Sequence, residues 1–238
     1  MDLPATEPAV TDPAVTDPAV TGPAGPEPEW LIDADDPLLT ADRLQRVADP
    51  SLPDRLTWNT LRTLALWDTD VWVPRLFSIA CGPDNVVSAL DWGGASVVPW
   101  AVGPFGQDVS DVVIDGPEGY AVVACTVQSD AIDQHVGAGA LAALDGSLHG
   151  ARQAGFVVVV PPGTPDMADR LDMATEIELM DGRLATDLLE GAMGSISWTD
   201  LGRLVLDLAE EADPDSEPAE SVHRLVTELQ ALYPDVPI

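Results

Sequence analysis

Hydrophobic positions in the first part of the chain follow a helical spacing. Between Pro53 and Trp67, leucines recur so that they lie on one broad side of a helix, which is typical of a helix that buries one face. A shorter helix, capped by Thr40 and containing Val47, is expected before it. We therefore expect residues 37–95 to be mainly helical.

The middle of the chain, residues 96–190, changes to short runs rich in valine and isoleucine. Such runs, separated by glycine- and proline-containing turns, predict β-strands. The expected strands are Ser96–Val102, Val109–Ile114, Tyr120–Val127, Phe156–Val160 and Ile177–Met180. The expected helices are Gly137–Gly150, Pro165–Ala174 and Arg183–Leu189. This order predicts an α/β fold with a crossover connection, in which Tyr120–Val127 pairs with Val109–Ile114 and Phe156–Val160 is buried.

The helical spacing returns in residues 191–238. Leucines and valines recur at helical intervals around Leu204 and again around Leu225, and the acidic linker Glu210–Glu217 separates the two groups. Two helices are expected here. Their apolar faces would form either an antiparallel pair packed on the α/β domain or a dimer surface.

Residues 1–36 differ from the rest of the chain. Residues 8–22 read PAVTD-PAVTD-PAVTG, so proline recurs every five residues. Proline removes a backbone donor, and the segment is acidic and has little to bury. We expect a disordered acidic tail whose deletion leaves the melting temperature of the protein unchanged.

The charge balance is extreme. The chain has 41 Asp and Glu residues against 10 arginines, no lysine, and a formal net charge of −31. No arginine lies between Arg75 and Arg152, whereas DNA-binding surfaces cluster Lys and Arg to displace counterions from phosphate. Two explanations remain open: a partner that is not nucleic acid, or a halophilic source whose salt screens the charge.

Other sequence features bear on the compartment and on the residues that could bind a metal. No apolar run approaches the roughly 20 residues that span a bilayer, and no basic segment followed by an apolar stretch begins the chain, so a cytoplasmic protein without membrane association is expected. Cys81 and Cys125 are interpreted as buried hydrophobic side chains. His135, His149 and His223 show no metal-ligand spacing.

Four short segments between residues 96 and 190 form a further pattern. Asp111-Val112-Val113-Ile114 is a strand opened by an acid, and Ala121–Thr126 is the next strand. Phe156–Val160 is followed by Pro161-Pro162-Gly163-Thr164, and Ile177–Ala185 reads IELMDGRLA. In this order they resemble the Mrr-type restriction-endonuclease domain of the PD-(D/E)xK nucleases, whose closing segment has the form I-x-L-I-D-G-x-x-L.

The resemblance implies a restriction-endonuclease-like sheet and a site for metal-dependent phosphodiester hydrolysis. In that family an acid opens one strand, and Gln or Glu, one residue and Lys close the next. Carboxylate oxygens bind Mg²⁺, which neutralises the phosphate and acidifies a water. The lysine positions that water and stabilises the developing negative charge.

Matched to this chain, the family positions are mostly lost. The acid corresponds to Asp111, the Gln/Glu position to Ala124 and the Lys position to Thr126. The family's acid on the preceding helix is not placed, because that part of the chain offers only Asp84. Asp111 is therefore the candidate catalytic acid, and it is a candidate metal ligand together with Asp108.

Asp115 is a further possible ligand partner of Asp111, and an ordinary strand-end acid facing solvent is the alternative interpretation of Asp111. We expect a catalytically degenerate Mrr-like protein, with helical extensions on both sides, that acts in DNA recognition or in assembly of a restriction or defence system. One alternative is an active nuclease with a migrated site, which would need Mg²⁺. The other is an interaction module, binding a protein partner or a second copy, with no nucleic-acid role.

Overall fold

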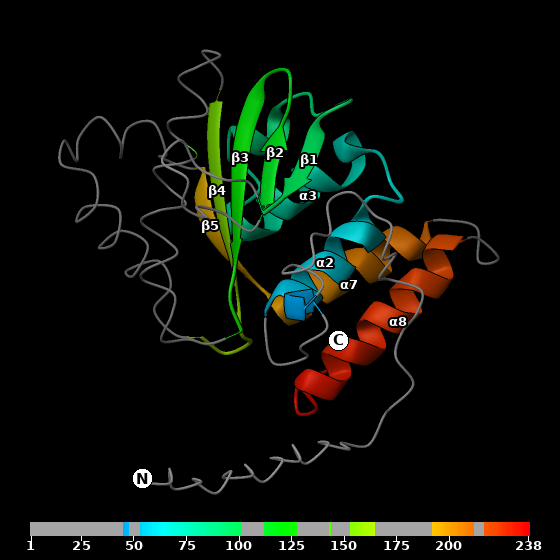
Figure 1. Ribbon diagram of the computed structural model, residues 1–238. Helices are drawn as coiled ribbons and strands as arrows, with labels where there is room; N and C mark the ends of the chain where they lie inside the picture. The colour runs from blue at the N-terminus through cyan, green and yellow to red at the C-terminus, as the bar shows by residue number, and fades with distance from the viewer. Residues whose placement is uncertain are drawn as a thin grey trace, which may run out of the picture. The chain divides into compact units, whose positions relative to one another are not determined.

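A computed structural model gives the structure of the protein (Figure 1). It describes residues 45–47, 53–100, 112–127, 143, 153–164, 192–211 and 217–238. The expected tail over residues 1–36 lies outside these residues. So do the helices expected in Pro165–Ala174 and Arg183–Leu189, the strand Ile177–Met180 and, apart from Ala143, the helix Gly137–Gly150.

A five-stranded mixed sheet forms the centre of the described fold. Its strands are β1 (Ser96–Pro99), β2 (Val112–Asp115), β3 (Gly119–Cys125), β4 (Gln153–Val160) and β5 (Met193–Ser197). They lie in sequence order across the sheet. β1, β2 and β3 are antiparallel neighbours, whereas β3–β4 and β4–β5 pair in parallel. The α/β fold is confirmed, as are the pairing of the second and third strands and the burial of the fourth.

Alternation along β3 separates two faces of the sheet. Ala121, Val123 and Cys125 contribute to one continuous hydrophobic core, while Val122 and Ala124 point to the opposite face. β4 is buried on both faces. A strand buried on both faces has no polar side to alternate with, which explains its continuous run of apolar residues from Phe156 to Val160.

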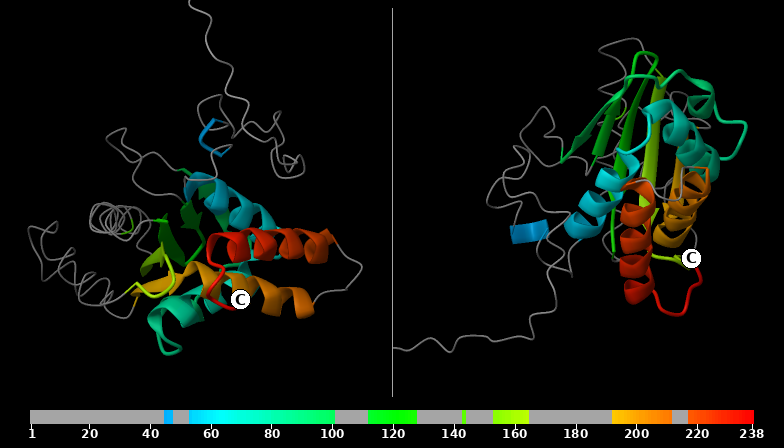
Figure 2. Two further views of the ribbon diagram at one scale, coloured as in Figure 1. Left: turned by 90° about the horizontal axis from the view of Figure 1, so that it is seen from below. Right: turned by 90° about the vertical axis from the view of Figure 1, so that its right-hand side faces the viewer.

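Among the described residues, four α-helices contribute to the core on the Val123 face. They are α2 (Pro53–Leu64), α3 (Thr69–Cys81), α7 (Trp198–Glu210) and α8 (Glu217–Leu232). Figure 2 shows α7 and α8 side by side, and Gly202 of α7 lies against Leu229 of α8. The antiparallel pair packed on the α/β domain is thus the arrangement observed for the apolar faces of these two helices.

Local signals explain where α7 begins. Ser197 closes β5 and caps the helix, since its Oγ accepts a hydrogen bond from the Asp200 backbone N–H at 3.0 Å. The strand β5 itself was not expected from the sequence, which assigned no strand to the segment after residue 191. The sheet therefore extends one strand further along the chain than the sequence pattern indicated.

Candidate functional site

The positions matched to the nuclease motif lie where β2 begins and β3 ends. Val112 of β2 pairs with Val123 of β3, so the start of one strand is beside the end of the other. Ala124 is 1% exposed and Thr126, the residue after Cys125, is 3% exposed. These two positions are part of a packed interior.

Thr126 is tied to two neighbouring elements through its backbone. Its N–H donates to the carbonyl of Val159 on β4 at 2.9 Å. Its carbonyl accepts a hydrogen bond from Nε1 of Trp198, the first residue of α7, at 2.8 Å. Trp198 is fully buried. The residue at the family's lysine position thus joins β3 to β4 and α7.

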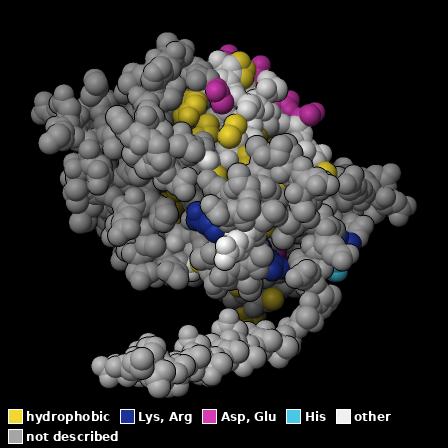
Figure 3. Space-filling view, viewed as in Figure 1, with side chains coloured by type: hydrophobic (Ala, Val, Ile, Leu, Met, Phe, Trp, Pro, Cys, Tyr) yellow, Lys and Arg dark blue, Asp and Glu magenta, His cyan; other side chains and the backbone are white. Residues whose placement is uncertain are grey.

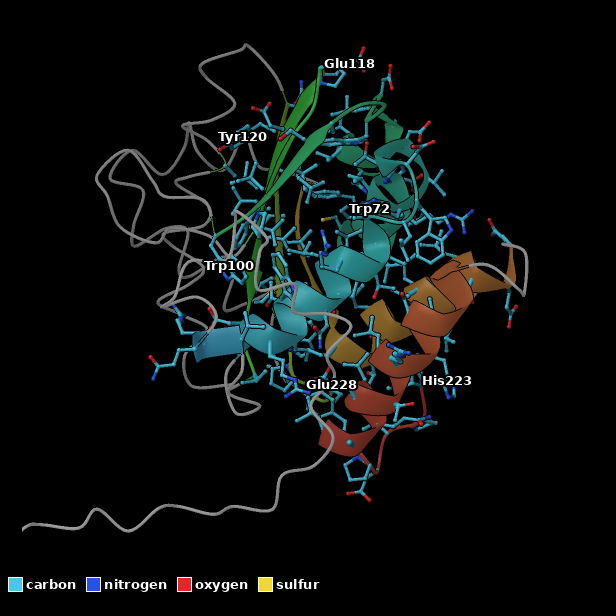
Figure 4. All side chains as sticks on the ribbon, turned by 45° about the vertical axis from the view of Figure 1, so that its right-hand side comes forward. Trp72, Trp100, Glu118, Tyr120, His223 and Glu228 are labelled. Carbon is cyan, nitrogen blue, oxygen red and sulfur yellow. The ribbon has the colours of Figure 1, made fainter. Side chains whose placement is uncertain are left out.

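Of the candidate acids, only Asp115 lies in the described residues, and it is not beside Ala124 or Thr126. Asp111 and Asp108 lie outside the described part of the chain. Asp115 is exposed and pairs with Tyr120 at the hairpin end of β2 and β3. Tyr120 precedes Ala124 by four residues, or about 13 Å along a strand. The possible ligand Asp115 is therefore remote from Ala124, at the end of the hairpin where Figure 4 labels Glu118 and Tyr120.

A buried acid that sequence reasoning missed lies on a helix before the sheet. Asp84, the acid considered there, is exposed, whereas Asp54 in the first turn of α2 is 3% exposed. Its Oδ2 is 2.9 Å from the Arg46 guanidinium, and its Oδ1 has no hydrogen-bond partner. An acid in a first helical turn is ordinarily explained by the helix dipole, so the sequence held no signal that Asp54 would be buried.

Neither of the two described motif positions offers a magnesium ion a side-chain carboxylate or amide oxygen. Ala124 has no oxygen on its side chain, and the Thr126 carbonyl is engaged by Trp198. Among the described residues, no three His, Cys, Asp or Glu side chains are grouped so that they could hold a metal. His223 is exposed on α8, and His135 and His149 lie outside the described residues.

Every arginine of the described ranges is engaged in a contact within the protein. Ion pairs join Arg46 to Asp54, Arg55 to Glu228, Arg75 to Glu211 and Arg203 to Asp200. Arg62 lies over the Trp58 ring at 5.5 Å from its centroid, and Arg224 also has a partner. In Figure 3, acidic side chains gather along the upper part of the described surface, away from the arginines.

The Arg75–Glu211 pair shows how these contacts act. Two hydrogen bonds of 2.8 Å join the guanidinium to the carboxylate. The pair raises the pKa of Arg75 and lowers the pKa of Glu211. Both side chains are exposed, so the pair contributes little to stability.

Trp58 and Trp100 form a stacked pair beside α2. Their ring centroids are 5.2 Å apart with an interplanar angle of 5°. Both side chains are buried, and Trp67 packs at the edge of the hydrophobic core. These rings are packing residues in this structure, since a base-stacking platform needs an accessible face.

The chain matches no protein-family model, and comparisons with curated proteins and with solved structures find no match either. Within the ranges that the structure covers, no helix is both long and apolar enough to cross a membrane. Functional inference therefore rests on the geometry of the fold and on the residues themselves.

Proposed function

We propose that this protein is a restriction-endonuclease-like domain that has lost cleavage and acts in recognition or assembly within a DNA restriction or defence system. The arrangement of strands supports the resemblance. β2 and β3 form an antiparallel hairpin, Ala124 lies on β3 with Thr126 just after it, and β3 pairs in parallel with the buried valine-rich strand β4. These strands correspond to three of the four segments on which the resemblance depends, and the fourth, Ile177–Ala185, lies outside the described residues.

The observation that carries the loss of cleavage is the environment of Ala124 and Thr126. The chemistry needs an oxygen ligand at the first position and a cation at the second. Ala124 supplies neither, and the chain has no lysine. Both positions are buried, and Thr126 is bonded to β4 and α7. A cation cannot be introduced there without desolvating it.

A non-catalytic interaction module with no nucleic-acid role is the second candidate. The engagement of all arginines in the described ranges favours it, as does the net charge of −31. Within the described ranges each guanidinium already has a contact inside the protein, whereas phosphate contacts provide most of the affinity of proteins for DNA. A protein partner or a second copy would then replace DNA as the ligand.

Plasmid cleavage tests the proposal. Purified protein is incubated with methylated and unmethylated plasmid, with Mg²⁺ or Mn²⁺, across a KCl series. We expect no cutting above background, because losing one preorganised group of this kind costs a factor of about 100 to 1,000. Robust cutting that disappears in Asp111→Ala contradicts the proposal and supports the active alternative. Cutting that survives Asp111→Ala indicates a contaminating nuclease.

A restored variant and a binding assay complete the design. Ala124→Gln with Thr126→Lys rebuilds the family pair, and circular dichroism first checks that the variant folds around these buried positions. Gain of cutting in the folded variant supports the assigned positions. A shift of DNA by the unmodified protein at its working salt supports recognition, whereas neither cutting nor binding supports the interaction module.

A further inference from the structure

Residues 233–238 follow α8 and turn back over the beginning of α7. The Tyr233 N–H still donates to the carbonyl of Leu229 at 2.9 Å, and the Val236 N–H then donates to the carbonyl of Tyr233 at 3.2 Å. Tyr233 and Ile238 both pack against the hydrophobic core. Figure 2 shows the end of the chain, marked C, beside α7 and α8. This short segment is therefore part of the folded structure.

Gly202, near the start of α7, provides the space that Ile238 occupies. A Cβ at Gly202 would lie 2.8 Å from Cδ1 of Leu229 on α8 and 3.0 Å from Cγ2 of Ile238. Glycine is less favourable than alanine inside a helix, so its presence here is explained by the two side chains that pack against it. The segment after α8 thus meets both helices of the pair at one point.

Arg203 holds the same segment through its backbone. Its Nη2 donates to the carbonyl of Pro237 at 2.7 Å, and its Nη1 donates to the Asp200 carboxylate at 2.8 Å. That carboxylate also accepts a hydrogen bond of 2.6 Å from the hydroxyl of Ser197, the residue that caps α7. The Arg203 side chain is half exposed, so these polar contacts contribute little alone. The packing of Ile238 is the larger contribution.

We propose that residues 233–238 act as a strap that fastens α8 to the beginning of α7. Ile238 packs beside Gly202, and Arg203 fixes the backbone next to it. The ends of a chain open at a lower free energy than core elements, so the strap opens while the sheet stays folded. Opening it loosens the first turns of α7, which begin at Trp198, whose indole bonds the backbone just after β3. The inference is independent of the proposed nuclease ancestry.

Two single variants each remove one attachment of the strap. Ile238→Ala removes the carbons that pack beside Gly202, and Arg203→Ala removes the hydrogen bond to the Pro237 carbonyl. Leu232→Ala is the matched control, because Leu232 is an aliphatic residue of the same size at the end of α8 but is 42% exposed. None of the three substituted side chains is fully buried, so all three variants are expected to fold.

Hydrogen exchange of the full chain, followed by mass spectrometry, tests the proposal. In Ile238→Ala we expect the amides of α7 and α8 to exchange about tenfold faster, because a partly buried aliphatic side chain no longer holds the strap closed. Arg203→Ala should give a smaller acceleration in the same two helices. The amides of β3 and β4 should keep their unmodified rates in both variants, and Leu232→Ala should match the unmodified protein throughout.

Gly202→Ala combined with Ile238→Ala tests the packing contact itself. Because Ile238 crowds the added Cβ, Gly202→Ala should shift the melting temperature less unfavourably in the Ile238→Ala background than in the unmodified protein. Additive shifts overturn the proposal, as does unchanged exchange of α7 and α8 in Ile238→Ala. Equal acceleration of β3 and β4 also overturns it, because Ile238 would then stabilise the whole fold. If Gly202→Ala does not fold, the exchange of Ile238→Ala still decides.

Discussion

At the scale of single residues, backbone groups constrain Thr126 more than its side chain does. Both hydrogen bonds that join it to Val159 and Trp198 use its peptide N–H and carbonyl. They are compatible with any residue except proline. A change of side chain at this position therefore leaves the junction between β3, β4 and α7 intact.

Cysteine reactivity provides a prediction at the same scale. Burial raises the pKa of the Cys81 thiol to about 12. The reactive species is the thiolate, and an ordinary thiol has a pKa of about 8.5. At pH 8 the thiolate fraction of Cys81 is thus on the order of a thousandfold lower than that of a free thiol. We expect slow labelling of the native protein by Ellman's reagent, measured by absorbance at pH 8.

Unfolding in guanidinium is the control for the labelling experiment, and both Cys81 and the buried Cys125 should then react quickly. The same shift affects stability at high pH. The folded pKa lies above the unfolded value, so this contribution is fully present below about pH 8 and is lost as the pH rises toward 12. Rapid labelling of the native protein at pH 8 would show that Cys81 is more accessible than the structure indicates.

At the scale of elements, residue propensity predicted the strands whose own sequences favour a strand. It did not predict the elements that form only because they pack against others. Tyr120–Val127 and Phe156–Val160 were predicted because β-branched residues fill them. No separate helix was predicted for α3, which contains Pro74 and several β-branched residues that disfavour a helix in isolation. α3 forms because its buried face, including Trp72 and Phe77, packs on the sheet.

The candidate site shows the same division between local and tertiary information. The sequence predicted a strand over Tyr120–Val127, and Ala124 lies on β3 with Thr126 directly after it, because strand propensity is local. It could not show that both are buried, or that Trp198, more than 70 residues later, would bind the Thr126 carbonyl. Nor did it identify Asp54 as a buried acid. These properties arise only when distant elements meet.

The contact between α3 and β5 provides a prediction for elements. A Cβ at Gly194 would lie 2.1 Å from the Ala80 carbonyl oxygen, which belongs to backbone that cannot rotate away. Gly194→Ala should therefore destabilise the fold by at least about 1–3 kcal/mol, the usual cost of overpacking. Guanidinium denaturation followed by tryptophan fluorescence measures the loss.

Gly93→Ala is the control for this variant. The nearest atom to its added Cβ is Asp91 Oδ1 at 3.1 Å, on an exposed side chain that can move. Its midpoint should remain close to that of the unmodified protein. Equal midpoints for Gly194→Ala and the unmodified protein would mean that α3 and β5 are not in close contact.

At the scale of the whole molecule, acidic residues greatly outnumber basic ones. The chain carries 41 acidic residues and 10 arginines, and each arginine in the described ranges is already engaged within the fold. The remaining acids repel one another, and this repulsion opposes the compact state. Ions in solution, rather than further internal pairs, must reduce that repulsion.

We therefore expect the folded state to depend on salt. The melting temperature should rise by several degrees between 0.1 and 2 M KCl, since each kcal/mol corresponds to roughly 2–4 °C for a protein of this size. The rise should level off near 1 M, where the Debye length is about 3 Å. Differential scanning calorimetry measures it. Sucrose serves as a control that stabilises without screening, and a flat response to KCl would count against a halophilic origin.

The ion pair between Arg55 and Glu228 has a consequence for the order of folding. It spans 173 residues of chain and joins α2 to α8, and Glu228 also bonds the buried Asn59 amide. On the ribosome, α2 is synthesised long before α8 emerges. Until α8 emerges, the nascent chain must hold the faces of α2 that contact α8 without their partner. Folding of this region therefore cannot be completed until residue 228 has been synthesised, and chains arrested before it leave Arg55 and Asn59 without Glu228.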